Sequence, residues 1–253
     1  MKELLKLSLE DPKIFVAILD AISTVIDEAV FIANEEALTL RSLDSARSAM
    51  VDVKLPKQFF TEYEISGQVN IGVRVKDLIK ISKLGRRGTT KFELEVPEGS
   101  NIIKLTFTAK SSVRTFELPL LDLALEQIPV PKVKYEATLK IVTDELYDAV
   151  KAVSTFSDSI EFKATKDRFI VSSGSEKGRG TTEYSRDQLI DLNVEAEEVV
   201  SAYSSNYLLD MVAYSELSEV LEVSFASRKP AKFYYSLING GELTFYVAPR
   251  TEV

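Results

Sequence analysis

The sequence predicts an α+β protein of two similar domains, in which few helices pack on much antiparallel sheet. Three observations lead to this prediction. The second half of the chain repeats the first, each half opens with an amphipathic helix, and most of the remainder alternates between apolar and polar residues, as half-buried strands do. At 253 residues the chain is long enough for two ordinary domains.

The internal repeat runs along both halves of the chain in the same order. Chance matching of apolar segments is the alternative, and the shared order favours a duplication. Further along, Pro119 follows Phe116 as Pro249 follows Tyr246. The identical positions are Ala21, Ser23, Thr24, Asp27, Phe31, Ala33 and Ser42, matched by Ala152, Ser154, Thr155, Asp158, Phe162, Ala164 and Ser173.

The first predicted helix spans residues 12–27, where apolar side chains recur at steps of three and four. We expect Asp11 to cap it and Pro12 to occupy its first position. The repeat predicts a corresponding helix that begins with Thr143 as its cap and runs to Val153. A shorter helix follows in each half, at residues 76–84 and 206–214.

Hairpins follow the shorter helices. Residues 91–96 and 103–107 alternate in polarity on either side of a Pro-Glu-Gly turn, and residues 221–225 and 233–235 form the matching pair. Between the halves, residues 119–134 contain three prolines and no helical cap, which predicts an extended linker. The expected division is therefore an N-terminal domain at 1–118, a connecting loop at 119–134 and a C-terminal domain at 135–253.

Composition excludes several kinds of chemistry. The chain has no Cys and no His, so disulfides, Cys/His zinc sites and imidazole-based triads are excluded. A net charge of −8 argues against a protein that coats nucleic acid over its whole surface. No apolar run approaches a membrane span and the start has no leader of signal length, so we expect an intracellular protein without membrane contact.

Two stretches suggest catalytic or phosphate chemistry, and each has an ordinary alternative. Residues 174–180 are glycine-rich, but a strand follows them, whereas a phosphate loop needs a helix N-terminus; an ordinary hairpin loop is favoured. The glutamates at 35–36 and at 195, 197 and 198 could supply a hydrolytic pair or bind magnesium, although a solvated acidic surface is the favoured interpretation.

Residues 76–87 are basic, with five Lys or Arg against one Asp and a local charge of +4. Lys76, Lys80 and Lys83 fall at i, i+4 and i+7, so we expect them to share one stripe of a helix while Ile79 faces elsewhere. A stripe of this kind suits a phosphate backbone read without sequence preference. The alternative is a solvated lysine face.

Three segments carry a resemblance to a known family. Residues 38–47, Leu-Thr-Leu-Arg-Ser-Leu-Asp-Ser-Ala-Arg, resemble the strand and Met/Leu-Asp-Ser turn of DNA sliding clamps, the proliferating cell nuclear antigen family. Residues 121–128 resemble that family's interdomain connecting loop, and residues 245–250 its tyrosine-x-alanine-proline-basic C-terminus. The resemblance spans the whole chain and is nearest to archaeal members.

The resemblance implies two clamp domains per subunit, with antiparallel sheets outside and helices lining the interior of a three-subunit ring. It implies a processivity factor for DNA replication and repair that encircles duplex DNA, without catalysis or cofactor. The implied partners are other clamp subunits in a homotrimer or heterotrimer, DNA polymerase, flap endonuclease, DNA ligase and a clamp loader. In an archaeal cell the expected location is the cytoplasm or nucleoid.

The resemblance also implies three sets of site residues. The DNA-facing set is Lys13, Lys76, Lys80, Lys83, Arg86, Arg87 and Lys151. The pocket for client peptides of the PIP-box type, for which plain core is the alternative, is Leu43, Arg47, Ser48, Met50, Ile128, Val130, Pro131, Pro230, Tyr246, Ala248 and Pro249. The subunit interface, for which internal pairing is the alternative, is Lys110, Val113, Thr115, Arg179, Thr181, Thr182 and Tyr184, on two edge strands.

One departure from the family leaves alternatives open. The predicted helix near 206–214 carries Asp210 but no Lys or Arg, and the helix before it has only Lys151, so we expect DNA contact mainly on the first domain. A specialised subunit of a heterotrimeric or checkpoint clamp is the first alternative function. A carboxylate- or metal-dependent hydrolase and a simple module that binds double-stranded DNA are the others.

Overall fold

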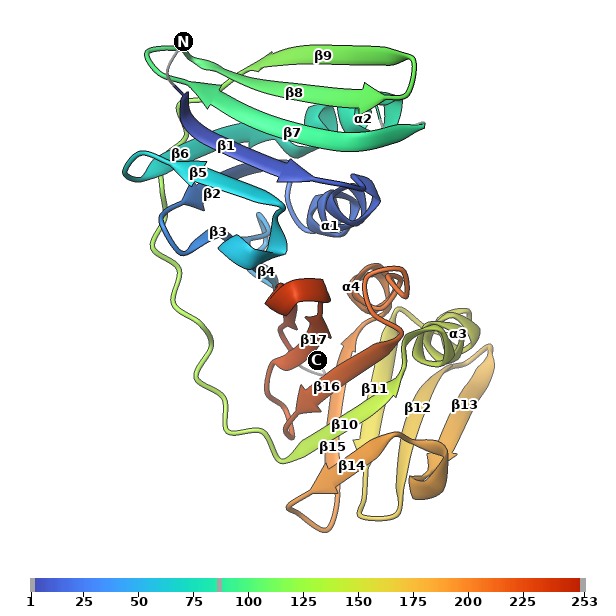
Figure 1. Cartoon of the computed structure of the whole chain (residues 1–253). Helices are drawn as coiled ribbons and strands as arrows, with labels where there is room; N and C mark the ends of the chain where they lie inside the picture. The colour runs from blue at the N-terminus through green and yellow to red at the C-terminus, as the bar shows by residue number, and fades with distance from the viewer. Residues whose placement is uncertain (1–2, 86–87, 251–253) are drawn as a thin grey trace. The chain divides into compact units, whose positions relative to one another are not determined.

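The computed structural model describes residues 3–85 and 88–250, and these form two compact units (Figure 1). Unit 1 comprises Met1–Ser45, Val51–Ile128 and Leu237–Leu243. Unit 2 comprises Ala46–Met50, Pro129–Ser236 and Thr244–Val253. Each unit therefore includes a short segment from the other half of the chain, Leu237–Leu243 in unit 1 and Ala46–Met50 in unit 2. A single boundary in the linker does not divide the chain into these two units.

Helices and strands follow the same order in the two halves of the chain, as the internal repeat predicts. The first half contains β1 (Glu3–Leu9), α1 (Lys13–Ser23), β2 (Glu28–Ala33), β3 (Ala37–Leu43), β4 (Ala49–Pro56), β5 (Glu62–Ile65), β6 (Val69–Arg74), α2 (Val75–Gly85), β7 (Thr89–Pro97), β8 (Ile102–Ala109) and β9 (Ser112–Pro119). The second half contains β10 (Ala137–Val142), α3 (Thr143–Ser154), β11 (Ser159–Ala164), β12 (Arg168–Ser175), β13 (Gly178–Ser185), β14 (Asp191–Val194), β15 (Val199–Ser204), α4 (Ser205–Met211), β16 (Val220–Phe225), β17 (Ala231–Ser236) and β18 (Glu242–Val247).

Strand pairing repeats as well. In the first half β1 pairs with β5 and β7, and β2 pairs with β3 and β6. The counterparts in the second half pair in the same way, β10 with β14 and β16, and β11 with β12 and β15. All of these pairs are antiparallel. The predicted α+β class and the duplication are both confirmed.

The predicted hairpins are confirmed at β7–β8 and β16–β17. Each places one apolar face in a core of aromatic rings. In unit 1, Phe92 lies with its ring centroid 5.4 Å from Phe15 and 5.0 Å from Phe107. In unit 2, Phe162 occupies the centre of such a cluster, 5.3 Å from Phe169 and 5.7 Å from Tyr203. The Phe15 ring packs α1 against its sheet in this way, whereas α3 packs through aliphatic side chains such as Leu146 and Val150.

Helix boundaries differ from the predictions in part. The helix expected at 12–27 ends at Ser23, where the hydroxyls of Ser23 and Thr24 donate to the carbonyls of Asp20 and Ala21. Ser154 and Thr155 repeat these bonds at the end of α3, which gives the matched Ser-Thr pair a physical reason. Hydroxyls that satisfy carbonyls locally favour the end of a helix.

The two predicted caps have different outcomes. Asp11 Oδ1 accepts the amide hydrogen of Lys13 at an N–O distance of 2.9 Å, so Asp11 does satisfy the first turn of α1, although Pro12 precedes the helix rather than opening it. The expected cap at Thr143 is wrong. Thr143 is the first residue of α3, and its buried hydroxyl donates to the Ser218 carbonyl at 2.7 Å instead. The shorter helices begin one residue early in both halves, at Val75 and Ser205, and the second ends at Met211.

Residues 120–135 form neither helix nor strand, as expected for a linker. No helix in the described part of the chain is long and apolar enough to span a membrane.

Candidate functional site

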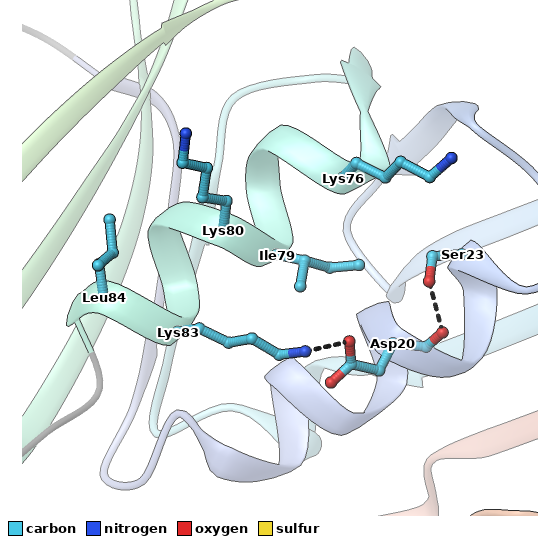
Figure 2. Close-up of a pocket in the computed structure, with 7 residues that line it drawn as sticks. All are labelled: Asp20, Ser23, Lys76, Ile79, Lys80, Lys83 and Leu84. Atoms are coloured by element: carbon cyan, nitrogen blue, oxygen red, sulfur yellow. Dashed lines mark hydrogen bonds and ion pairs between the residues drawn. The ribbon is translucent and has the colours of Figure 1, made fainter.

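An open groove of about 540 Å³ lies between α1 and α2 in unit 1 (Figure 2). The groove has an apolar floor and a charged rim. Ile79 is 8% exposed and points toward α1, while Lys76, Lys80 and Lys83 are exposed along α2. Asp20 and Ser23 of α1 and Leu84 of α2 complete the lining. This surface therefore concentrates positive charge on a protein that is acidic overall.

The three lysines line this one groove, in keeping with the predicted stripe, although their side chains point in different directions. The expectation that Ile79 faces elsewhere is wrong, because Ile79 lines the same groove. Lys76 and Lys83 turn toward α1 on either side of Ile79, and Lys80 points away from α1 (Figure 2). Lys83 Nζ lies 2.7 Å from Asp20 Oδ1, and Lys76 is ion-paired with Asp27. Among the residues that the structure describes, no carboxylate is in ion-pair contact with Lys80.

The other described residues expected to face DNA, Lys13 and Lys151, are on different helices. Lys13 lies at the start of α1, where its Nζ is 3.4 Å from Asp11. Lys151 is on α3, with its Nζ 5.4 Å from the centre of the Tyr147 ring. Arg86 and Arg87 lie outside the described residues.

Unit 2 presents a different charge pattern on its helices. Exposed carboxylates at Asp144, Glu145 and Asp148 occupy α3 beside the single Lys151, and α4 carries exposed Asp210 without a basic residue. The helices of unit 1 and unit 2 are related by the repeat but not by charge. A polyanion would therefore be attracted to α2 and repelled by much of α3 and α4.

Main-chain groups of the linker attach its first part, residues 121–128, to unit 1 at two points. The amide of Leu121 donates to the Gly72 carbonyl on β6 at 2.8 Å. A Cβ atom at Gly72 would lie 2.2 Å from the Leu121 carbonyl oxygen, so this close approach requires glycine. At Ile128, the side chain of Arg41 donates to the main-chain carbonyl at 3.1 Å and forms a 2.8 Å ion pair with Asp52.

The expected pocket residues divide between the units. Leu43 and Ile128 belong to unit 1 and are half-buried, and the remaining nine belong to unit 2. Within unit 2 the Ala248 amide donates to the Ser48 carbonyl at 2.8 Å, which brings these two predicted residues together. Val130 is 40% exposed and Arg47 is exposed with a φ of 55°, whereas Pro131, Pro230 and Pro249 are half-buried.

Two of the expected pocket residues are buried inside unit 2. Met50 is 2% exposed and Tyr246 is 9% exposed, so they can offer at most an edge to a peptide. Sequence alone did not separate these core side chains from surface anchors. Truncating Tyr246 would open a cavity as well as alter a docking surface, which makes it a poor probe of binding.

Sequence reasoning missed Tyr135, which follows the linker directly. Burial, with a smaller contribution from nearby Tyr246, raises the pKa of the Tyr135 hydroxyl well above its usual range. Its oxygen is buried and has no hydrogen-bond partner among the described residues. Lys232 Nζ lies 6.0 Å from the ring centre. The only signal in the sequence was an aromatic residue where an extended linker enters a strand.

The expected interface strands both lie at sheet edges. β9 pairs with β8 and ends one sheet, and β13 pairs with β12 and ends another. On β9, Val113 is 65% exposed, Thr115 is exposed, and Lys110 lies exposed just before the strand. On β13, Arg179 and Thr181 are exposed, while Thr182 and Tyr184 are half-buried. Each strand therefore has one side available for pairing.

The alternative chemistries gain no support from the structure. Residues 174–180 form the β12–β13 hairpin, and no helix N-terminus follows them. Glu195 is paired with Lys134 and Glu198 with Lys163, and residues 35–36 lie in the turn between β2 and β3. No group of three acidic, His or Cys side chains in the described residues is placed to hold a metal ion.

Comparisons with known proteins agree over nearly the whole chain. A family model described as Rad9 matches residues 15–233. The DNA polymerase sliding clamp of Pyrococcus horikoshii is 34% identical over 245 residues, 96% of this chain and 97% of that protein, and DNA polymerase sliding clamp 1 of Pyrobaculum aerophilum is 32% identical over 244 residues, 96% of each. The crystal structure of PCNA from Thermococcus kodakaraensis matches with a TM-score of 0.91 at 26% identity, covering 97% of this chain and 100% of that one.

Proposed function

The chain belongs to the DNA polymerase sliding-clamp family, which includes proliferating cell nuclear antigen, and we propose that it is a non-catalytic processivity factor. As a ring, it would encircle duplex DNA and tether replication and repair enzymes. The observation that carries this proposal is the match to clamps named for DNA polymerase over 96% of the chain. The charge distribution supports it independently, because cations gather on α2 of an otherwise acidic protein.

DNA contact would occur mainly through unit 1. Lys76, Lys80 and Lys83 supply positive charge on a helix, with no aromatic side chain in the groove that they line. Such a surface attracts backbone phosphates and does not stack or read bases. Arg86 and Arg87 would extend it, with smaller contributions from Lys13 and Lys151. Binding of this kind is sequence-neutral and salt-dependent, as sliding requires.

Ring closure would use the two edge strands. An edge presents unpaired main-chain groups that can add a strand from another molecule. Pairing β9 of one subunit with β13 of the next is a head-to-tail contact, and such contacts form a closed ring when the rotation closes. Exposed Val113, Thr115, Arg179 and Thr181 would meet there. The partners are then further clamp subunits.

Client proteins would dock by short peptides beside the linker. Ile128 and Val130 are apolar residues in a proline-bounded segment, and both retain exposed surface. Leu43 and the segment around Ala248 and Pro249 supply the rest of the surface that the family resemblance implies. The proposed clients are DNA polymerase, flap endonuclease, DNA ligase and a clamp loader. The proposed location is the cytoplasm or nucleoid of an archaeal cell.

A retention experiment tests this function. The protein is loaded by a clamp loader onto nicked circular DNA, and retention is measured before and after the circle is cut. A ring remains on the circle through a high-salt wash and leaves when the DNA is linearised. Equal retention on both substrates would instead indicate a simple module that binds duplex DNA. Stimulation of long-product synthesis by a family polymerase is the second measurement.

A specialised subunit of a mixed ring is the second candidate. The observation that favours it is the acidic surface of α3 and α4, which a subunit with basic helices would offset. The mass in solution distinguishes the candidates. A homotrimer forms from the purified chain alone, whereas a specialised subunit remains monomeric until a different clamp chain is added.

A further inference from the structure

Two of the lysines that line the groove between α1 and α2 are paired with carboxylates. Asp20 is on α1 and Asp27 follows it, and each is ion-paired with a lysine of α2, Lys83 and Lys76 respectively. Lys80 is directed away from Asp20 (Figure 2). Two of the three lysines on the proposed DNA surface therefore already have an anionic partner within the same subunit.

We propose that Asp20 and, to a smaller extent, Asp27 set the strength with which this clamp holds duplex DNA. A backbone phosphate competes with the carboxylate for the lysine ammonium group. This inference deepens the proposed function and rests on it. The ligand is the DNA phosphate backbone, and Asp20 is the residue that limits its affinity.

Exposure ranks the two pairs. The side chains of Lys76 and Asp27 are 73% and 75% exposed, so solvent and salt screen their attraction strongly. Those of Lys83 and Asp20 are 48% and 31% exposed, and Asp20 sits at the rim of the groove over its apolar floor. The Lys83–Asp20 pair is therefore the more persistent. A phosphate competes less well for the ammonium group of Lys83 than for that of Lys76.

The pairing also alters the salt dependence of binding. A lysine that contacts phosphate releases condensed counterions, and each such contact steepens the dependence of log K on log salt by about 0.9. A lysine that exchanges a carboxylate for a phosphate gives up its attraction to that carboxylate, which stays close to the DNA phosphates and repels them. The net contribution of such a paired lysine to DNA affinity is therefore smaller than that of Lys80, although all three lysines carry the same charge.

Removing the carboxylate tests the inference directly. Binding of the assembled protein to a short fluorescent linear duplex is followed by anisotropy across a salt series for the parent protein, Asp20→Asn, Asp27→Asn and Glu98→Gln. Glu98 is exposed in the β7–β8 turn, outside the residues that line the groove, and controls for the change in net charge. We expect Asp20→Asn to bind several-fold more tightly at low salt, with a slope steeper by up to about 0.9, and Asp27→Asn to show a smaller gain.

A double-variant comparison makes the test specific to the pair. Lys83→Ala should cost little affinity in the parent protein and clearly more in the Asp20→Asn background, whereas Lys80→Ala should cost the same in both. Equal gains from Asp20→Asn and Glu98→Gln, or an equal cost of Lys83→Ala in both backgrounds, would overturn the inference. If Asn disturbs α1, seen as a loss of helical signal or assembly mass, Asp20→Ser removes the same charge.

Failure of the proposed function gives a different result. If the parent protein and every variant bind duplex DNA without salt dependence, or do not bind it, the DNA-facing role of α2 itself is refuted. If the parent binds with a clear salt slope and Asp20→Asn binds identically, the clamp function stands and the role of Asp20 is refuted.

Discussion

Proline on the outer edge of β13 should open the proposed ring. Adjacent residues of an edge strand direct their N–H groups alternately toward the neighbouring strand and away from it. Thr181 and Thr182 are opposite Ser172 and Val171 of β12, so one of the two amides is used within the sheet and the other faces outward. Proline removes whichever amide it replaces.

The magnitude follows from the length of the two edges. β9 and β13 are each 8 residues long, so their antiparallel pairing supplies roughly one main-chain hydrogen bond per residue. Losing one shared bond and leaving its carbonyl without a partner costs about 1–3 kcal/mol per interface. A ring of three identical subunits contains three such interfaces, so the variant ring is weakened by about 3–9 kcal/mol, or ~10²–10⁶ in its association constant.

The assay is the molecular mass of Thr181→Pro and Thr182→Pro from nanomolar to micromolar concentration, with thermal unfolding measured alongside. We expect one variant to unfold at lower temperature, because its amide belongs to β12 pairing, and the other to remain folded but dissociate. Thr181→Ala and Thr182→Ala keep both amides and should retain the mass of the parent. A folded proline variant of the outward-facing amide that keeps the full mass of the ring would refute the assignment of β13 as an interface strand.

Three further predictions concern the linker and the C-terminal segment. Gly72→Ala places a Cβ atom 2.2 Å from the Leu121 carbonyl oxygen, so it should displace the start of the linker and weaken client peptide binding while the mass of the ring is unchanged, as fluorescence titration and sedimentation would show. Ile128→Ala should weaken binding of a PIP-box peptide roughly tenfold, as loss of an apolar anchor of ~1–2 kcal/mol does, and unchanged affinity would place the docking surface elsewhere. The Arg250 guanidinium, which hydrogen-bonds Asp158, holds the pKa of that carboxyl below its usual range, so the pair is present at neutral pH and is lost as pH falls through the lowered pKa. Arg250→Gln should raise the pKa of Asp158, measured by NMR titration, toward the ordinary value of an aspartate.

The fold was predictable because the information is repeated within the chain. Apolar periodicity places helices and hairpins, and two copies of the same order remove most chance matches. Helix ends were less predictable. The hydroxyls of Ser23 and Thr24 donate to carbonyls of the preceding turn, where α1 ends. Apolar spacing alone, which includes Ile26, does not account for these hydrogen bonds and so predicts a longer helix.

The site was predictable only to the level of which element carries charge. Helical spacing places Lys76, Lys80 and Lys83 within one sector of α2, but a long side chain reaches whichever partner lies near its tip. Asp20 and Asp27 are distant in sequence, so their effect on Lys83 and Lys76 becomes visible only when α1 and α2 pack together. The burial of Tyr246 was not predictable for a related reason. Residue type alone does not tell whether an apolar side chain is in the core or on the surface.

The attachment of the linker by main-chain groups has a consequence for how this clamp can evolve. The Leu121 amide and the Ile128 carbonyl are its anchors, and neither depends on the side chain of the residue that provides it. The mostly exposed residues 122–127 can therefore drift in sequence while the path of the segment is preserved. If client peptides dock on this loop as proposed, their choice can change through residues 122–127 while the fold is kept. Gly72 and Arg41, outside the loop, are the positions where mutation would disturb its path.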